Sequence, residues 1–438
     1  MWPISQSTRL KLVERMAKNL VTPSIWSRKY GLLKPDGDGS SAVQLYAKES
    51  SRLMIDVIKR GPVAKADAEL GILAKIKECD GTTFDISGDP RKVIDGEEAE
   101  ILLKLLTEPG RRYTKIYIVA GRPEEEALEV MEMFSSALEG SKLHSLNLSY
   151  NALGEKGIRA FGALLKSQHD LEELYLINDG ISEEAAMAVH ELLPSTDKLK
   201  DFRCSSTRVE SEGGIALATE LGSCTHLKKL DLRDNMFGVD AGLALSKVLS
   251  EFSNLSEIYL SYLNLEDEGS IAIWNALKES APSLEVLDMA GNEITARAAP
   301  VLASFIASKQ FLTKLNLAEN ELKDEGAILI AKALEEGHGQ LCEVDMNTNM
   351  IRRAGARCLA LAVISKPSLK LLNINGNYIS DEGIDEVRDT FKNCPTVLGP
   401  LDENDPDGED YDEEEEQDGH IEHELESKLK GLEIKHED

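Results

Sequence analysis

Residues 143–170 read LHSLNLSYNALGEKGIRAFGALLKSQHD, and residues 171–198 repeat the pattern as LEELYLINDGISEEAAMAVHELLPSTDK. Each copy keeps the spacing L-x-x-L-x-L-x-x-N-x-L and continues into an amphipathic run of about sixteen residues. The first half predicts a short β-strand and the second half an α-helix. One such unit cannot bury its own apolar face, so neighbouring copies must stack. Further copies follow at steps of 28 or 29 residues, beginning at Leu199, Leu227, Leu255, Leu284, Leu312, Leu341 and Leu369.

The repeated pattern resembles the long form of the leucine-rich repeat. This resemblance implies an α/β solenoid, a ribonuclease-inhibitor-like crescent with parallel strands on the concave face and helices outside. The spacing of elements predicts the same curvature, because neighbouring strands lie about 4.8 Å apart and packed helices need about 8–10 Å. In the copy that begins at Leu227, Leu230 and Leu232 should point inward while Lys229 and Asp231 point outward.

An asparagine recurs where each predicted strand ends. The chain must turn sharply there, and an amide side chain can bond the backbone groups that the turn leaves unpaired. Asp179 and Thr207 stand in for this residue, and Leu263 breaks the row without a physical account from the sequence. The consensus residue occurs as Asn151, Asn235, Asn292, Asn320, Asn349 and Asn377.

The charge balance excludes some classes of partner. The 438 residues carry a formal net charge of −29, and residues 402–438 hold 18 acidic residues against 3 lysines. Nucleic acid and anionic membranes are therefore poor partners, and a basic protein is a better one. The start of the chain lacks an apolar run, and no stretch approaches eighteen consecutive apolar residues, so neither secretion nor membrane insertion is expected. Six cysteines without C-x-x-C spacing suit a reducing compartment.

Motifs of ordinary enzymes and metal sites are weak in this sequence. It contains no Walker loop, H-E-x-x-H, G-x-S-x-G or G-x-G-x-x-G motif. His420 and His423 lie three residues apart without a rigid frame, and residues 403–414 resemble a calcium loop only in the spacing of their acids. We interpret both as parts of a solvated acidic tail and expect no metal site.

Four regions follow from these patterns. Residues 1–60 predict a small helical targeting domain, and residues 61–112 a linker and N-terminal cap in which residues 84–86 could form a strand. Residues 113–397 predict one imperfect repeat, with a helix that opens at Pro123, and nine clear repeats. Residues 398–438 predict a disordered acidic tail.

The N-terminal region carries a more specific resemblance. Residues 2–16, WPISQSTRLKLVERM, with SRKYGLL at 27–33 and YAKESSRLMIDVIKRGP at 46–62, resemble the WPP domain of plants. A WPP domain joined to long leucine-rich repeats and an acidic tail is similar to the arrangement of plant RanGAPs, the GTPase-activating proteins of the small GTPase Ran. The repeats alone would not specify a function, because that scaffold carries many.

The resemblance implies a GTPase activator without an active site or cofactor of its own, since GTP and Mg²⁺ belong to Ran. In this family an asparagine in an early repeat, rather than an arginine finger, positions Ran's catalytic glutamine. The family context L-S-D-N-A-L/F-G matches residues 148–154, which makes Asn151 the candidate catalytic residue. Tyr150, Asp234 and Asn235 become candidate Ran-binding residues, and Trp2 and Pro3 candidate targeting residues.

The resemblance also implies Ran-GTP as partner, location in the cytoplasm and at the cytoplasmic side of the nuclear envelope, and coiled-coil anchors there. The sequence departs from the family at several points: Tyr150 replaces an acid, Ile4 follows Trp2-Pro3, and a helix after Leu33 is missing. Two repeats are also missing, near Val119 and at the junction of residues 200 and 201. These departures motivate an alternative, a catalytically impaired scaffold that binds Ran or other proteins. A ribonuclease-inhibitor-like binder is disfavoured, because such inhibitors are rich in cysteine and lack a WPP-like module.

Overall fold

The computed structural model describes residues 83–85, 99, 103, 115–117, 124–194 and 197–405. The chain divides into two compact units, Met1–Ala74 and Lys75–Asp438, and all described residues belong to the second. The predicted targeting domain with Trp2 and Pro3 lies outside the described residues, as does the predicted tail after residue 405.

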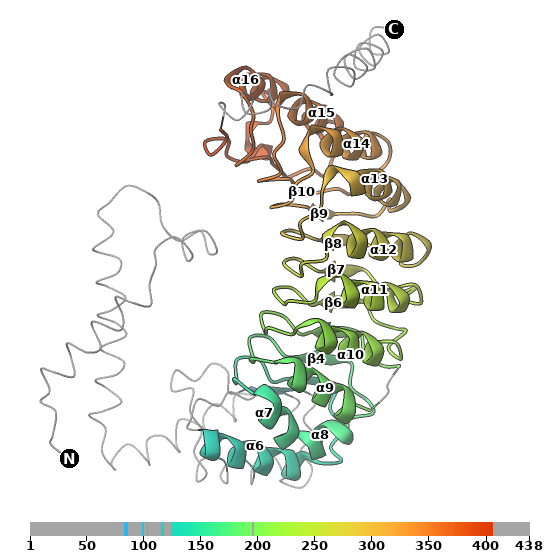
Figure 1. Cartoon of the computed structure of the whole chain (residues 1–438), viewed down its shortest axis with the longest axis vertical. Helices are drawn as coiled ribbons and strands as arrows, with labels where there is room; N and C mark the ends of the chain where they lie inside the picture. Colours follow the sequence, from blue (N-terminus) through green and yellow to red (C-terminus); the bar gives the residue numbers. More distant parts are fainter. Residues whose placement is uncertain are drawn as a thin grey trace, which may run out of the picture. The chain divides into compact units, whose positions relative to one another are not determined.

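Eleven strands in the described part of the chain form one parallel sheet in sequence order (Figure 1). Each strand has three residues, and β2 to β10 each pair with the strands before and after them. They are β1 Thr83–Asp85, β2 Lys115–Tyr117, β3 Ser145–Asn147, β4 Glu173–Tyr175, β5 Asp201–Arg203, β6 Lys229–Asp231, β7 Glu257–Tyr259, β8 Val286–Asp288, β9 Lys314–Asn316, β10 Glu343–Asp345 and β11 Leu371–Asn373.

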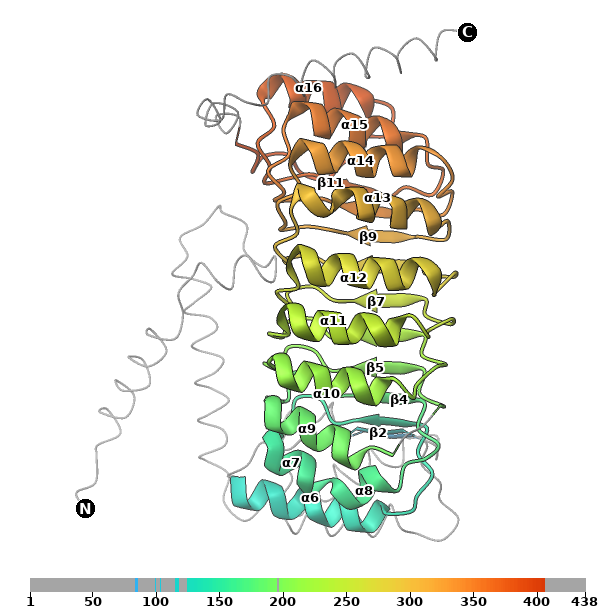
Figure 2. The same cartoon turned by 45° about the vertical axis from the view of Figure 1, so that its right-hand side comes forward.

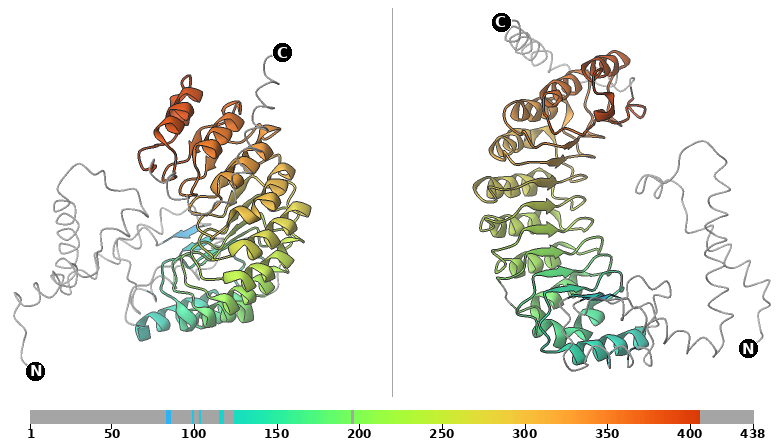
Figure 3. Two further views of the ribbon diagram at one scale, coloured as in Figure 1. Left: turned by 45° about the horizontal axis from the view of Figure 1, so that its top comes forward. Right: turned by 180° about the vertical axis from the view of Figure 1, so that it is seen from behind.

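A layer of helices lies on the other side of the repeats from the strands (Figure 2). Each strand from β2 onward is followed by a helix, and β3 by the two short helices α7 and α8. Figure 3 shows the strands side by side on the concave side of the repeats, as the spacing argument predicts. The helices are α6 Glu124–Leu138, α7 Gly154–Ala160, α8 Gly162–Lys166, α9 Glu183–Leu192, α10 Ser211–Leu221, α11 Gly238–Leu249, α12 Glu266–Glu279, α13 Ala299–Ser308, α14 Lys323–Glu335, α15 Arg353–Ile364 and α16 Asp381–Thr390, with the 3₁₀ turns η1 Ala296–Ala298 and η2 Pro395–Val397.

The core is a set of apolar columns that run along the solenoid. From β3 onward, the central residue of each strand pairs in register with its equivalent 28 or 29 residues away, as Leu146 does with Leu174 and Leu287 with Leu315. These side chains are fully buried, and Leu148 and Leu176 form a second buried column two residues later. The period of the sequence therefore fixes the register, because a slip by one residue would expose every column.

The first repeats largely follow the prediction. Helix α6 begins directly after Pro123 and ends at Leu138, as expected. Strand β1 confirms a strand near Phe84, which pairs with Ile116 of β2. The sheet therefore begins within the region assigned to the linker and cap.

The boundary predicted for the tail at residue 398 is too early. Leu398 pairs with Leu372, and the Gly399 N–H donates to the Leu372 carbonyl at 2.8 Å. Leu401 is 7% exposed, and Asn404 Oδ1 accepts from the Asn377 N–H at 2.9 Å, as a ladder asparagine does. Residues 398–405 thus form a partial repeat that covers the end of the solenoid, although their composition alone suggested disorder.

Candidate functional site

The predicted asparagines form a continuous ladder that joins each turn to the next. Asn377 is representative: its Oδ1 accepts the N–H groups of Asn349 at 2.7 Å and Ile351 at 3.0 Å. Its Nδ2 donates to carbonyls in its own repeat and to Met346 O, at 3.1 Å, in the repeat before. Because buried backbone groups need partners, this one side chain is sufficient to close two turns.

Leu263 has a physical explanation in this ladder. Its side chain is fully buried, and its N–H donates to Asn292 Oδ1 at 3.1 Å. Asn292 Nδ2 also donates to Leu260 O at 2.8 Å, a carbonyl that an asparagine at position 263 would reach from its own repeat. On the other side, the Asn235 N–H donates to the Tyr262 carbonyl at 3.2 Å. The turn at Leu263 therefore takes its hydrogen bonds from its neighbours.

The residue before each ladder position adopts the left-handed backbone conformation, with φ between 53° and 67°. These residues are exposed or half-buried, whereas the ladder residues behind them are buried. We call this set the left-handed row. It consists of Tyr150, Asn178, Ser206, Asp234, Tyr262, Gly291, Glu319, Thr348 and Gly376.

Asn151, the candidate catalytic residue, is a ladder residue that is 4% exposed. Its Nδ2 donates to the carbonyls of Leu148 and Ser149, and its backbone N–H donates to Asp179 Oδ1 at 2.7 Å. The neighbouring Tyr150 N–H donates to the next repeat through a backbone bond of 2.8 Å. The amide is therefore held rigidly at the end of a short loop, in the position the sequence predicts.

Tyr150 is the most exposed large side chain near this loop, at 59%. Its φ of 67° is unusual for a bulky residue. It lies next to Asn151 in the chain, so a partner that reaches Asn151 meets Tyr150 as well. Its predicted contact with a partner stays a prediction.

The other two predicted binding residues differ from each other. Asp234 belongs to the left-handed row and is half-buried. Burial chiefly raises the pKa of the Tyr262 hydroxyl, and the charge of Asp234 adds to that shift. Asn235 is 5% exposed, and its Oδ1 accepts from the Thr207 hydroxyl at 2.6 Å while its Nδ2 donates to Cys204 O at 2.8 Å. The turn thus bonds both ends of the Asn235 amide, as it bonds the amide of Asn151, and the contact of Asn235 with a partner stays a prediction.

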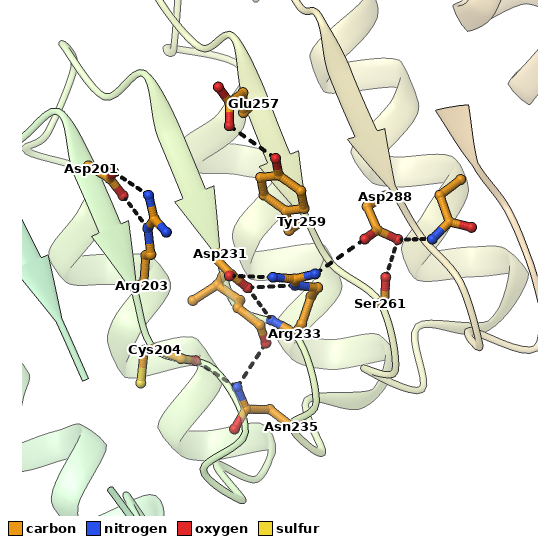
Figure 4. A network of polar contacts seen from close by, with 12 residues as sticks. Asp201, Arg203, Cys204, Asp231, Arg233, Asn235, Glu257, Tyr259, Ser261 and Asp288 are labelled. Atoms are coloured by element: carbon orange, nitrogen blue, oxygen red, sulfur yellow. Dashed lines mark hydrogen bonds and ion pairs between the residues drawn. The ribbon is translucent and has the colours of Figure 1, made fainter. Parts of the chain in front are cut away.

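The strand surface carries a polar network that the sequence did not single out (Figure 4). Arg203 binds Asp201 through two bonds, of 2.9 and 2.7 Å, and its guanidinium lies 4.8 Å from the centre of the Tyr175 ring. The repeat that contains β6 does the same with Arg233 and Asp231. Because each guanidinium is held by a carboxylate of its own repeat, neither is extended toward a partner as an arginine finger would be.

Arg233 also links this network to later repeats. It lies 3.5 Å from Asp288 and 4.7 Å from the centre of the Tyr259 ring. Asp288 also accepts from Ser261 and from Asn316, although burial raises the pKa of its carboxyl. The alternation of Tyr, Arg and Asp at equivalent positions of successive repeats is the signal that could have revealed this network from sequence.

The described residues contain no cluster of three or more histidine, cysteine or acidic side chains that could hold a metal ion. None of their helices combines the length and apolar character needed to cross a membrane. His420, His423 and most of residues 403–414 lie outside the described residues.

Two family models match this chain. The WPP domain matches residues 1–37 and 34–68, which includes the region of the WPP-like motifs. The Leucine Rich repeat matches residues 141–162, 223–246, 280–303, 308–331 and 365–387, all within the observed repeats.

Curated relatives extend the similarity to the whole chain. RAN GTPase-activating protein 2 of Arabidopsis thaliana is 54% identical over 530 residues, which cover 100% of this chain and 97% of the relative. RAN GTPase-activating protein 1 of the same plant is 57% identical over 522 residues, 99% of this chain and 96% of the relative. Both alignments are longer than this chain, in keeping with the expected missing segments. A ribonuclease inhibitor of Mus musculus is 32% identical over 145 residues, 33% of this chain and 32% of the relative.

Proposed function

This chain belongs to the family of plant RAN GTPase-activating proteins, and from this premise we propose that it stimulates GTP hydrolysis by Ran. The observation that carries the proposal is the identity of more than half of the aligned residues, over nearly the full length of two relatives with that name. The alternative of a catalytically impaired scaffold is less favoured, because the two relatives that span nearly the whole chain both carry the name of the activator, whereas the ribonuclease inhibitor matches only 33% of it.

The chemistry takes place in Ran, and this chain contributes Asn151 in trans. GTP hydrolysis depends on positioning and on electrostatic stabilisation, so a rigid amide that orients Ran's catalytic glutamine, and through it the attacking water, is sufficient. The loop supports this role because Asn151 is held by two carbonyls of its own repeat and by Asp179 of the next. GTP and Mg²⁺ are bound by Ran, and this chain supplies no cofactor.

Ran lies against the edge of the solenoid that carries the left-handed row. Tyr150 and Asp234 are two members of that row, and both are accessible to a partner. The acidic composition, with a net charge of −29, attracts the basic surface of Ran and raises the association rate. Activity in the cytoplasm and at the nuclear envelope, with the WPP domain bound to a coiled-coil anchor, converts exported Ran-GTP to Ran-GDP.

The test is single-turnover hydrolysis by GTP-loaded Ran with catalytic amounts of this protein, Asn151→Ala or Asn320→Ala. Asn320 is the matched control, since it is a ladder residue that is likewise 4% exposed and lies six repeats away from Asn151. We expect the parent to accelerate hydrolysis, Asn151→Ala to lower kcat by roughly 10²–10³-fold, and Asn320→Ala to retain kcat while it is folded.

Equal losses of kcat in the two variants would mean that Asn151 has only its structural role in the ladder. Absence of acceleration by the folded parent would exclude GTPase activation. Binding of Ran-GTP to the inactive parent would then identify the scaffold of the alternative.

A further inference from the structure

Asp179 is the one acid at a ladder position among the described repeats, and it contacts the candidate catalytic loop directly. Its side chain is fully buried, and Oδ1 accepts the Asn151 N–H at 2.7 Å. Oδ2 is also buried and has no hydrogen-bond partner among the residues that the structure describes. Unpartnered buried oxygens are uncommon in native proteins and need an explanation.

The ladder asparagines of other repeats show which atom normally stands at the position of Asp179 Oδ2. In Asn377 and in Asn320, Oδ1 accepts from the preceding repeat, as Asp179 Oδ1 does. Their Nδ2 atoms donate to carbonyls three residues earlier, Ile374 and Leu317. Asp179 Oδ2 occupies the place of that donor. An ionised carboxylate can only accept, whereas a carboxylic acid has one donor and one acceptor, the same pattern as an amide.

We propose that Asp179 is a positioning residue for Asn151 that acts as a neutral carboxylic acid, with Oδ1 accepting the Asn151 N–H and Oδ2–H donating to a backbone carbonyl. This inference rests on the proposed function, because it gives Asp179 its effect through Asn151. It makes the GTPase activation sensitive to pH at a group that Ran does not contain.

The surroundings of Asp179 support the neutral form. Burial raises the pKa of its carboxyl to about 8, and the Asn151 N–H only partly opposes this shift. The titratable group that faces it from the following repeat is the Cys204 thiol, whose own pKa burial raises to about 12, so this thiol stays neutral. The preceding repeat presents the Asn151 N–H, and no described cation acts on the carboxyl. Asp179 therefore holds its proton at neutral pH and loses it above about pH 8.

Loss of that proton disturbs the loop at both ends. The Asp179 side chain holds the Asn151 N–H, and its backbone carbonyl accepts the Gly154 N–H at 3.2 Å. A buried carboxylate is costly and draws the turn toward water, which moves the oxygen that fixes Asn151. Displacement of a positioning group by about 1 Å is enough to lower kcat by about a hundredfold.

The test compares the full-length protein with Asp179→Asn, which keeps the ladder geometry and cannot ionise, across pH 6 to 9. Single-turnover hydrolysis by GTP-loaded Ran gives kcat and KM, and thermal unfolding gives the midpoint at each pH. We expect kcat of the parent, relative to Asp179→Asn, to fall about tenfold by pH 9, one unit above the pKa, with little change in KM. Asp179→Ala, which lacks both oxygens, should have low kcat at every pH.

Stability supplies a second readout that does not involve Ran. A carboxyl with a raised pKa in the folded state contributes stability below its unfolded pKa of about 4, and this contribution is lost as the pH rises toward about 8. The unfolding midpoint of the parent should therefore fall relative to that of Asp179→Asn up to about pH 8. The double variant Asp179→Asn/Asn320→Asp, which moves the carboxyl to a distant ladder position, should show pH-dependent stability like the parent with the kcat profile of Asp179→Asn.

The outcomes separate this proposal from the proposed function. Acceleration by both proteins with the same pH profile of kcat would overturn the role of Asp179 and leave GTPase activation standing. Coinciding unfolding profiles would show that Asp179 does not titrate in this range and would overturn the proposal as well. If neither folded protein accelerates hydrolysis, both the proposed GTPase activation and the role of Asp179 are excluded.

Discussion

Replacement of Asn292 by alanine should be the most destabilising single change in the ladder. This side chain is fully buried and lies beside the turn where Leu263 has no amide of its own. Its Oδ1 accepts the N–H groups of Leu263 at 3.1 Å and Leu265 at 3.3 Å, and its Nδ2 donates to Leu260 O at 2.8 Å. Asn292→Ala therefore leaves two buried N–H groups and one carbonyl without these partners.

The magnitude follows from the cost of unsatisfied buried polar groups, about 1–3 kcal/mol each. Two N–H groups give about 2–6 kcal/mol, and the Leu260 carbonyl adds about 1 kcal/mol. Asn320→Ala also orphans two N–H groups, those of Asn292 and Ile294. It isolates no equivalent carbonyl, because Met289 O keeps its bond from Asn292 at 3.1 Å. Asn292→Ala should therefore cost about 1 kcal/mol more than Asn320→Ala.

Urea unfolding followed by circular dichroism measures these differences, provided that the m-value is unchanged. Asn404→Ala is the mild control, since Asn404 is only partly buried and water can replace its bond to the Asn377 N–H. It should cost less than about 1 kcal/mol. A loss for Asn292→Ala no larger than that for Asn404→Ala, or smaller than that for Asn320→Ala, would refute the account of Leu263.

Three further changes test other parts of the structure. Burial raises the pKa of Asp324 to about 6, so the stability that its proton contributes is lost as the pH rises from about 4 to about 6. Asp324→Asn should remove this loss, on the order of 3 kcal/mol, from the pH dependence of the urea midpoint. Tyr150→Asp restores the family's acid at a site that is 59% exposed and should lower the KM for Ran-GTP by about two- to fivefold in steady-state assays, with kcat retained. Lys309→Met removes a buried ammonium that donates to Ser280 O at 2.6 Å and Lys278 O at 3.3 Å, and should cost about 1–3 kcal/mol in urea unfolding.

The fold was predictable because the apolar residues that form its core recur at a regular spacing in the sequence. Positions such as Leu146 and Leu174 recur at one spacing, and stacking equal units leaves a single register in which all of them are buried. The boundary after residue 397 was less predictable, because Leu401 and Asn404 continue the repeat within an acidic segment. These two residues lie in the register of the repeat and contact the preceding repeat, so the segment folds although its composition is acidic.

The sequence motif was enough to name a candidate residue, whose role stays a prediction, but it did not show the surroundings of that residue. The motif occurs at both Asn151 and Asn235, and both amides are buried and bonded within their turns, so the ladder geometry alone does not distinguish the two. Asp179 looked like a simple substitute for asparagine. Its neutral character depends on complete burial and on an oxygen without a donor nearby, which are properties of the stacked repeats and not of the local sequence.

The ladder residue and the residue of the left-handed row have different roles in each turn. The ladder residue is buried and fixes the backbone, so the residue before it takes the same conformation whether it is Tyr150, Asp234 or Gly376. Left-handed backbone costs a bulky residue about 1–3 kcal/mol, a cost that persists because the bonds on either side determine the turn. The exposed side chain can then vary from repeat to repeat without loss of the fold. The amide recurs in most repeats, so what sets Asn151 apart from the other ladder asparagines is expected to come from the residues that differ around it, Tyr150 before it in the chain and Asp179 in the next repeat.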